Sequence, residues 1–237
     1  MNSQSYAQSI SVAAAANLNG VLDAIVQQYT KQTGVPIKVV YGSSGHFYQQ
    51  MTQGAKFDIF LSANEEFVDR LVTQGASSGS GVIYARGRLV LLVSQKSKIR
   101  PSADMQDIKQ AIRDGRLTKF AIANPALAPY GLAAKQALQQ LGLAQLLQPI
   151  LVLGGDVGQT MLFIKSEAAQ AGMVPWSIIK TSPNIKEDEY FLIPEKSHQP
   201  ILQKMLLFKD ANSQARLFYE FLQTEKIRTI WRQYGYE

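Results

Sequence analysis

Four stretches of the sequence run from an apolar, strand-like segment directly into small or polar residues that open a helix. They are ISVAAAANLNG (10–20), IKVVYGSSGHF (37–47), FAIANPALAPYG (120–131) and LVLGGDVGQ (151–159). The first backbone N–H groups of a helix have no partner within the helix, and that end of the helix carries a partial positive charge. Four such ends directed at one place would bind an oxyanion without lysine or arginine. The sequence therefore favours anion binding over catalysis.

Two polar residues stand at the first pair of these helix starts. Asn17 follows four alanines, and Ser44 lies in Gly-Ser-Ser-Gly together with Ser43. Asparagine and serine are ordinary helix caps, so local capping alone is enough to explain each of them. The small neighbours favour a second interpretation, because they allow a ligand to approach the backbone N–H groups and the hydroxyls together.

Three further candidates would act in different ways. Tyr130 follows Pro129, which suits the first turn of a helix, and its hydroxyl would either enter a cleft or cover apolar surface. Val157 follows Asp156, the expected cap, so a ligand contact would use the Val157 backbone N–H. Ala63 could offer only its N–H, which makes it the weakest of the candidates.

The hydrophobic period alternates between strand-like and helix-like along the chain, which predicts an α/β protein with sheets covered by helices. The segment 82–94 reads as one long strand or two joined strands. The same number of residues separates Asn17 from Ser44 as separates Tyr130 from Val157, which agrees with two related lobes. The expected strands are 10–15, 36–41, 58–62, 119–123, 149–153, 172–175, 190–194 and 200–208. The expected helices are 17–33, 45–54, 64–74, 104–114, 130–142, 157–170, 211–222 and 224–234.

Composition excludes several classes of protein. The 237 residues are 46% hydrophobic and 18% charged, as in an ordinary globular protein. The 24 Lys and Arg residues exceed the 18 acidic residues by a net charge of +6, but they are dispersed along the chain. Dispersed charge of this kind favours a solvated surface over nucleic-acid binding. The absence of cysteine excludes disulfides and thiolate chemistry.

Sequence motifs for enzymes and cofactors are also missing. No segment fits a P-loop, and GSSGHF and GGDVG lack the spacing of a dinucleotide-binding loop. The two histidines, His46 and His198, are far apart in the sequence, which argues against a histidine-based metal site or catalytic triad. We therefore expect no cofactor, no metal ion held directly by side chains, and no enzymatic activity.

The amino-terminal nine residues are polar and lack the apolar core of a signal peptide. The longest apolar run, LVLLV (89–93), has the length of a strand and is far shorter than a membrane span of about 20 residues. If the protein is exported, its leader is absent from this sequence.

Taken together, six segments resemble, in order and spacing, the molybdate-binding proteins of ABC importers, the ModA family. They are AAAANL (13–18), YGSSG (41–45), FDIFLSAN (57–64), NPALAPYG (124–131), GDVGQ (155–159) and FYEFLQTEKIRTIWRQYGY (218–236). The resemblance implies a type II periplasmic binding protein fold, with two lobes, mixed sheets flanked by helices, and two hinge strands. It places lobe 1 at 1–86 plus 202–237 and lobe 2 at 87–201, with the ligand cleft between them.

The resemblance also implies the site and the partners. The family's oxyanion contacts fall on Asn17 and Ser44 in lobe 1 and on Tyr130 and Val157 in lobe 2, with a weaker contact at Ala63. The chain differs at Pro175, where the family commonly has tyrosine, so that donor is lost unless Tyr130 or Trp176 supplies it. The implied protein is a periplasmic monomer that captures molybdate or tungstate and delivers it to the membrane permease of an ABC importer.

Three alternatives to this function can be weighed from the sequence. The ligand could be sulfate, phosphate or an organic acid in place of molybdate. An enzyme on the same two-lobed fold, like porphobilinogen deaminase, would need a cysteine to hold its cofactor, and the chain has none. The effector domain of a transcription regulator would need a DNA-binding segment, for which the residues before the first strand leave no room.

Overall fold

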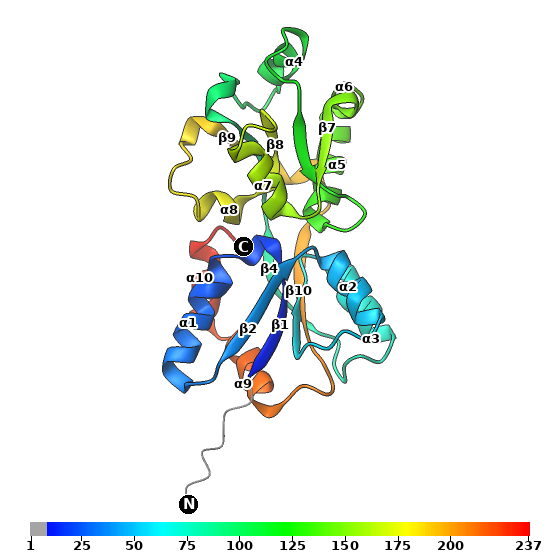
Figure 1. Ribbon diagram of the computed structural model, residues 1–237, viewed down its shortest axis with the longest axis vertical. Helices are drawn as coiled ribbons and strands as arrows, with labels where there is room; N and C mark the ends of the chain where they lie inside the picture. The colour runs from blue at the N-terminus through cyan, green and yellow to red at the C-terminus, as the bar shows by residue number, and fades with distance from the viewer. Residues whose placement is uncertain (1–8) are drawn as a thin grey trace, which may run out of the picture.

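The chain folds into two α/β lobes, each built on a mixed sheet of five strands (Figure 1). The computed structural model describes residues 9–237. The expectation about an absent leader concerns the polar residues 1–9, which lie almost entirely outside the described residues. Two lobes built on mixed five-stranded sheets agree with the architecture that the resemblance implies.

The first sheet has the strand order β2-β1-β3-β10-β4. Its strands are β1 (Ile10–Ala15), β2 (Ile37–Gly42), β3 (Ile59–Leu61), β4 (Val82–Gly87) and β10 (Ile201–Leu207). Strands β1, β2 and β3 are parallel, and Ala14 lies opposite both Tyr41 and Leu61. The segments that follow these three strands, including Asn17, Ser44 and Ala63, therefore leave the sheet at the same edge.

The second sheet has the strand order β7-β6-β8-β5-β9. Its strands are β5 (Leu89–Val93), β6 (Phe120–Ala123), β7 (Leu151–Gly154), β8 (Ala171–Pro175) and β9 (Tyr190–Leu192). Strands β6 and β7 are parallel, with Ala123 opposite Gly154. The loops that lead to Tyr130 and Val157 therefore also begin at one edge of one sheet.

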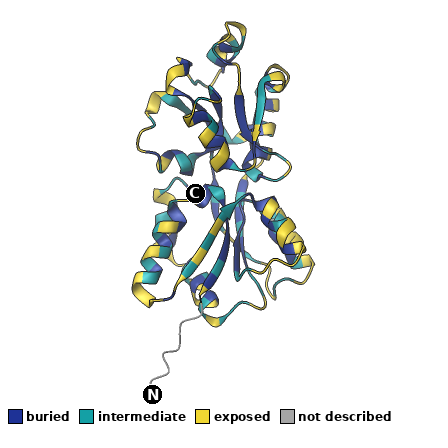
Figure 2. Ribbon diagram, viewed as in Figure 1, coloured by how far each residue is buried: buried dark blue, intermediate teal, exposed yellow. Residues whose placement is uncertain are grey.

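Helices cover both sheets, with their exposed faces outward and the central strands, such as β1, β3, β5, β6 and β8, buried between them (Figure 2). Those of the first lobe are α1 (Val21–Thr33), α2 (Ser44–Thr52), α3 (Glu66–Thr73), α9 (Ser213–Phe221) and α10 (Glu225–Gln233). Those of the second lobe are α4 (Gln106–Arg113), α5 (Pro129–Gln140), α6 (Ala144–Leu147), α7 (Val157–Lys165) and α8 (Trp176–Lys180). None of the helices within residues 9–237 combines the length and apolar character needed to cross a membrane.

Two strand connections join the lobes. Strand β4 passes through Arg88 into β5, and the segment 193–200 leads from β9 back to β10. The carboxyl-terminal residue pairs with the first connection, because Arg86 and Glu237 exchange backbone hydrogen bonds of 2.7 and 2.9 Å. In Figure 1 the carboxyl terminus accordingly lies between the lobes. The lobe boundaries expected at 86/87 and 201/202 lie within one residue of the end of β4 and the start of β10.

Several expected elements differ in the structure. The helix expected over 17–33 is split into a short 3-10 helix, η1 (Ala16–Leu18), and α1, because Gly20 adopts a φ of 86° between them. The helix expected to reach residue 170 ends at Lys165, and Glu167 turns the chain with a φ of 62°. Trp176, which directly follows the strand expected over 172–175, begins α8.

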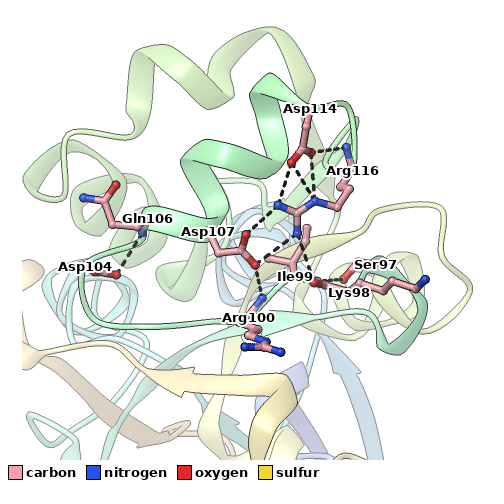
Figure 3. A network of polar contacts seen from close by, with 9 residues as sticks. All are labelled: Ser97, Lys98, Ile99, Arg100, Asp104, Gln106, Asp107, Asp114 and Arg116. Atoms are coloured by element: carbon pink, nitrogen blue, oxygen red, sulfur yellow. Dashed lines mark hydrogen bonds and ion pairs between the residues drawn. The ribbon is translucent and has the colours of Figure 1, made fainter.

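A polar network stabilises the end of lobe 2 that lies farthest from lobe 1 (Figures 1 and 3). The Arg116 guanidinium donates to Asp107 at 2.7 Å and to Asp114 at 2.9 Å. The Asp107 carboxylate also accepts from the backbone N–H of Arg100 at 2.7 Å. These bonds hold the pKa of Asp107 and of Asp114 below the usual carboxyl value, with the Arg116 hydrogen bond as the largest cause.

Candidate functional site

Asn17 lies in η1, directly after β1, and its side chain is fully engaged inside the protein. Its Nδ2 group donates to Gln203 Oε1 at 3.0 Å and to Tyr236 Oη at 2.9 Å, and the residue is 1% exposed. An amide Nδ2 has two hydrogens, and both are used here. With both amide hydrogens bonded within the protein, the backbone N–H groups of η1 are the donors that remain, and the oxyanion contact expected at Asn17 stays a prediction.

The carbonyl oxygen of Asn17 accepts from both lobes. Ser177 Oγ, in α8 of the second lobe, donates to it at 2.9 Å, and Tyr236 Oη donates at 2.8 Å. Because the carbonyl is fixed on one side, the N–H groups of η1 face a defined direction. Neither Ser177 nor Tyr236 was expected from the sequence.

Ser44 begins α2, and its hydroxyl oxygen accepts from the backbone N–H of Ala63 at 3.0 Å. The two residues are 1% and 2% exposed. Since the oxygen already accepts, the Ser44 hydroxyl hydrogen is available to a ligand. The Ala63 N–H thus holds the Ser44 hydroxyl in place, and the weak ligand contact expected at Ala63 stays a prediction.

The start of α2 contacts the opposite lobe directly. Ser43 Oγ and the Gly45 N–H both donate to the carbonyl oxygen of Leu127, at 2.5 and 2.8 Å. Leu127 lies in the loop before α5, three residues ahead of Tyr130 in the sequence. The lobes are thus closed against each other at this point.

Tyr130 lies in the first turn of α5 and its hydroxyl is at the hinge. Tyr130 Oη accepts from Gln203 Nε2 at 3.0 Å, and the residue is 2% exposed. A Cβ on Gly87 would lie 2.0 Å from this oxygen, so only glycine fits at the end of β4. The hydroxyl hydrogen points away from the donating amide and is available to an acceptor.

Val157 is the first residue of α7. Its cap is Asp156, as expected, whose carboxylate accepts from the Gln159 N–H at 2.9 Å. That bond satisfies the third N–H of the helix and leaves the first two, at Val157 and Gly158, for another partner.

One buried cluster brings candidates of the two lobes together. Ala15 and Ala63 of lobe 1 belong to the same cluster as Tyr130 and Val157 of lobe 2. A pocket between the lobes is lined by η1, the end of β2 and the start of α7, through Ala16, Asn19, Tyr41, Asp156, Gly158, Gln159, Met161, Ile178 and Thr181. None of the five candidate residues lines this pocket, whereas Ala63 lines a second pocket between the lobes, together with Arg70 of α3 and Pro129 of α5. Gln203 links Asn17 to Tyr130, and Leu127 links α2 to the start of α5.

The pocket lined by η1 and the start of α7 is polar but nearly free of charge. Within residues 9–237, no lysine or arginine lines this pocket, and its one carboxylate, Asp156, accepts the capping bond from the Gln159 N–H. The pocket that includes Ala63 is also lined by Glu65, Glu66, Asp69 and Arg70. Burial raises the pKa of Tyr84, Tyr130 and Tyr236 well above the ordinary tyrosine value, so these hydroxyls remain protonated donors. The described residues contain no cluster of three or more His, Asp or Glu side chains suited to a metal ion.

The position that differs from the family pattern lies at the end of β8. Pro175 pairs with Leu89 in the sheet, and the Trp176 ring packs against Tyr190 with centroids 5.1 Å apart. The Trp176 ring also fills the space beside Gly235, where a Cβ would lie 2.4 Å from it. Trp176 is thus engaged with the carboxyl-terminal segment, and the hydroxyl nearest in sequence to Pro175 is that of Ser177.

Sequence reasoning missed Gln203, yet the sequence carried a signal for it. Alternation along β10 places Gln203 on the same buried face as Ile201 and Met205, and all three are buried. A glutamine on an apolar strand face requires polar partners, which predicts a buried network. No comparable signal existed for Tyr236, which meets Asn17 only through the fold.

Comparisons with known proteins agree with this arrangement. Residues 10–237 match the family model described as bacterial extracellular solute-binding protein. The molybdate-binding protein ModA of Rhodobacter capsulatus is 34% identical over 227 residues, which cover 94% of this chain and 86% of that protein.

Solved structures agree as well. The periplasmic molybdate-binding protein of Azotobacter vinelandii superimposes with a TM-score of 0.85 at 30% identity, covering 96% of this chain and 98% of that chain. The substrate-binding domain of a putative molybdenum ABC transporter from Clostridium difficile gives a TM-score of 0.66 at 26% identity, covering 97% and 98%. The chain belongs to the bacterial extracellular solute-binding protein family and, within it, to the ModA family.

Proposed function

We propose that this protein is the substrate-binding component of an ABC importer, which captures molybdate, and also tungstate, between its two lobes. The names of its relatives support this role, because they describe molybdate-binding proteins and part of a molybdenum ABC transporter. The ligand is released unchanged to a membrane permease, so the protein acts without catalysis and without a cofactor. We further propose that it does so in the periplasm, as a monomer.

The observation that carries the proposal is the meeting of neutral donors from both lobes. The N–H groups of η1, the Ser44 hydroxyl, and the first N–H groups of α5 and α7 belong to segments that contact one another across the interface. Hydrogen bonds to a charged acceptor contribute roughly 1.5–3 kcal/mol each, so several such donors suffice for tight binding.

Selectivity follows from the kind of donor. A site made of N–H and O–H groups suits a fully deprotonated dianion, because every ligand oxygen meets a donor. Phosphate near neutral pH keeps a hydrogen, which would need an acceptor, and the N–H and O–H groups named above are donors. Burying that hydrogen without an acceptor would weaken phosphate binding.

Isothermal titration calorimetry with molybdate, tungstate, sulfate and phosphate tests the proposal. We expect tight binding of molybdate and tungstate, with sulfate and phosphate at least about tenfold weaker, a difference of about 1.4 kcal/mol. Tighter binding of sulfate, phosphate or an organic acid than of molybdate would overturn the assignment of the ligand. Molybdenum content measured after soaking and dialysis provides an independent check.

A further inference from the structure

We propose that Gln203 is a positioning residue of the anion site, which fixes the ligand-binding elements of both lobes in one hydrogen-bonded chain. The inference rests on the proposed function and extends it to a residue outside the pocket. Gln203 is 0% exposed and lies on β10, beside the hinge.

The contacts of Gln203 reach both lobes. Its Oε1 accepts from Asn17 Nδ2 at 3.0 Å and from Tyr84 Oη at 2.9 Å, whereas its Nε2 donates to Tyr130 Oη at 3.0 Å. Asn17 belongs to the first lobe and Tyr130 to the second. One side chain therefore holds a candidate ligand residue of each lobe at the same time.

The direction of these hydrogen bonds determines which donor groups are available to the ligand. Because the amide donates to Tyr130, the tyrosine hydrogen is turned away from Gln203 and is free to donate. Because the amide oxygen accepts from Asn17, η1 is held with its carbonyl toward Ser177 and Tyr236 and its N–H groups outward. A glutamate at this position would accept from both neighbours, turn the Tyr130 hydrogen inward, and add a negative charge beside an anion site.

The groups around Gln203 require a neutral side chain at this position. Its titratable neighbours are Tyr84 and Tyr130, and burial raises the pKa of both. Of the charged side chains on β4 and β10 and between β4 and β5, Arg86 and Arg88 pair with Glu195, Arg88 also pairs with Glu237, and Lys204 pairs with Asp69. These three cations, the ones on these segments within residues 9–237, are thus already paired and would not compensate a carboxylate at position 203.

The test is the substitution Gln203→Glu, which preserves shape and changes hydrogen-bond direction and charge. We expect the affinity for molybdate to fall tenfold or more at about pH 9 and to recover at about pH 6, because burial raises the pKa of a carboxyl and the protonated form can again donate. The wild type is titrated in parallel over the same range. An affinity equal to that of the wild type at both pH values, or a loss that does not change with pH, would overturn the proposal.

A second variant covers the case in which Gln203→Glu does not fold. Tyr84→Phe removes a hydroxyl that bonds to Gln203 Oε1 at 2.9 Å and to the Ser62 carbonyl at 3.1 Å, without touching Asn17 or Tyr130. We expect it to weaken molybdate binding severalfold. The matched control is Tyr219→Phe, which removes a half-buried hydroxyl bonded to the Met205 carbonyl on the same strand, 3.3 Å away. Equal affinities of the two tyrosine variants would contradict a positioning role.

The two proposals fail in different ways. The wild type is first titrated with molybdate, tungstate, sulfate and phosphate, and the variants are then measured with whichever anion binds most tightly. A different preferred anion overturns the assigned ligand but leaves the Gln203 proposal to be judged by its own pH response. Normal binding by the variants overturns the role of Gln203 alone.

Discussion

The backbone N–H of Ala63 donates to the hydroxyl oxygen of Ser44 over 3.0 Å, and this bond sets the direction of the serine hydrogen. The two residues follow different strands of the first sheet, β3 and β2, and meet beyond the edge at which both strands end. The Ala63 N–H therefore fixes the Ser44 hydroxyl, and the ligand contacts expected at both residues remain predictions.

The substitution Ser44→Ala tests this arrangement. It removes the hydroxyl donor and leaves the buried Ala63 N–H without its partner, so we expect molybdate affinity to fall by roughly 1–3 kcal/mol. Calorimetry measures the loss directly. The matched control is Ser166→Ala, an exposed serine after α7, which should bind as the wild type does. Unchanged affinity of Ser44→Ala would mean that Ser44 only supports the local fold.

The substitution Gly45→Ala tests closure of the lobes. A Cβ at Gly45 would lie 2.7 Å from the carbonyl oxygen of Leu127 and 2.9 Å from its Cα, both in the opposite lobe. Alanine favours the helical conformation over glycine by up to about 1 kcal/mol, so the substitution should not weaken α2 itself. We therefore expect a folded protein that closes poorly, with a larger radius of gyration in small-angle scattering and a weaker affinity for molybdate.

The control for Gly45→Ala is Gly79→Ala, because a Cβ at Gly79 meets no atom within 4 Å. It should leave both the radius of gyration and the affinity unchanged. A Gly45→Ala protein that closes and binds normally would show that α2 and the loop before α5 can separate without cost to the site.

Local sequence patterns were sufficient to predict most strands and helices and to place Asn17, Ser44, Tyr130 and Val157 at helix starts. The reason is that strand alternation, helix period and capping act over a few residues. Asn17 shows where such reasoning stops. Its amide is as suitable for a ligand as for Gln203, and only the long-range contact between them decides which it binds.

Local patterns also do not predict the contacts between the lobes, because these contacts join residues that are far apart in the sequence. Nothing near Ser43 in the sequence indicates that its hydroxyl meets the Leu127 carbonyl, and nothing near Tyr236 indicates that it meets Asn17. The break between η1 and α1 was missed because the apolar period continues across Gly20, although that glycine takes a backbone conformation that ends the first helical turn.

The substitution Ser177→Ala addresses the second lobe. The Ser177 hydroxyl donates across the interface to the Asn17 carbonyl at 2.9 Å, a bond that exists only while the lobes are together. Its loss should weaken molybdate binding by about 0.5–1.5 kcal/mol, chiefly through faster dissociation, which stopped-flow measurement resolves. Thr229→Val is the control, because the Thr229 hydroxyl bonds only within its own helix, to the Glu225 carbonyl. Identical dissociation rates for the two variants would contradict an interface role for Ser177.

The pair formed by Arg116 and Asp107 provides a pH-dependent prediction at the far end of lobe 2 (Figure 3). The hydrogen bond from Arg116 lowers the pKa of Asp107, so its stabilising contribution is present above the unfolded-state pKa and is lost as pH falls through the lower folded-state pKa. Arg116→Ala removes that contribution. The difference in free energy of unfolding between wild type and variant, measured in urea, should therefore be constant near neutral pH and shrink below about pH 4. Molybdate affinity should not change, because the network is remote from the interface between the lobes. A difference that stays constant into acid would show that Arg116 acts through packing rather than through the Asp107 carboxylate.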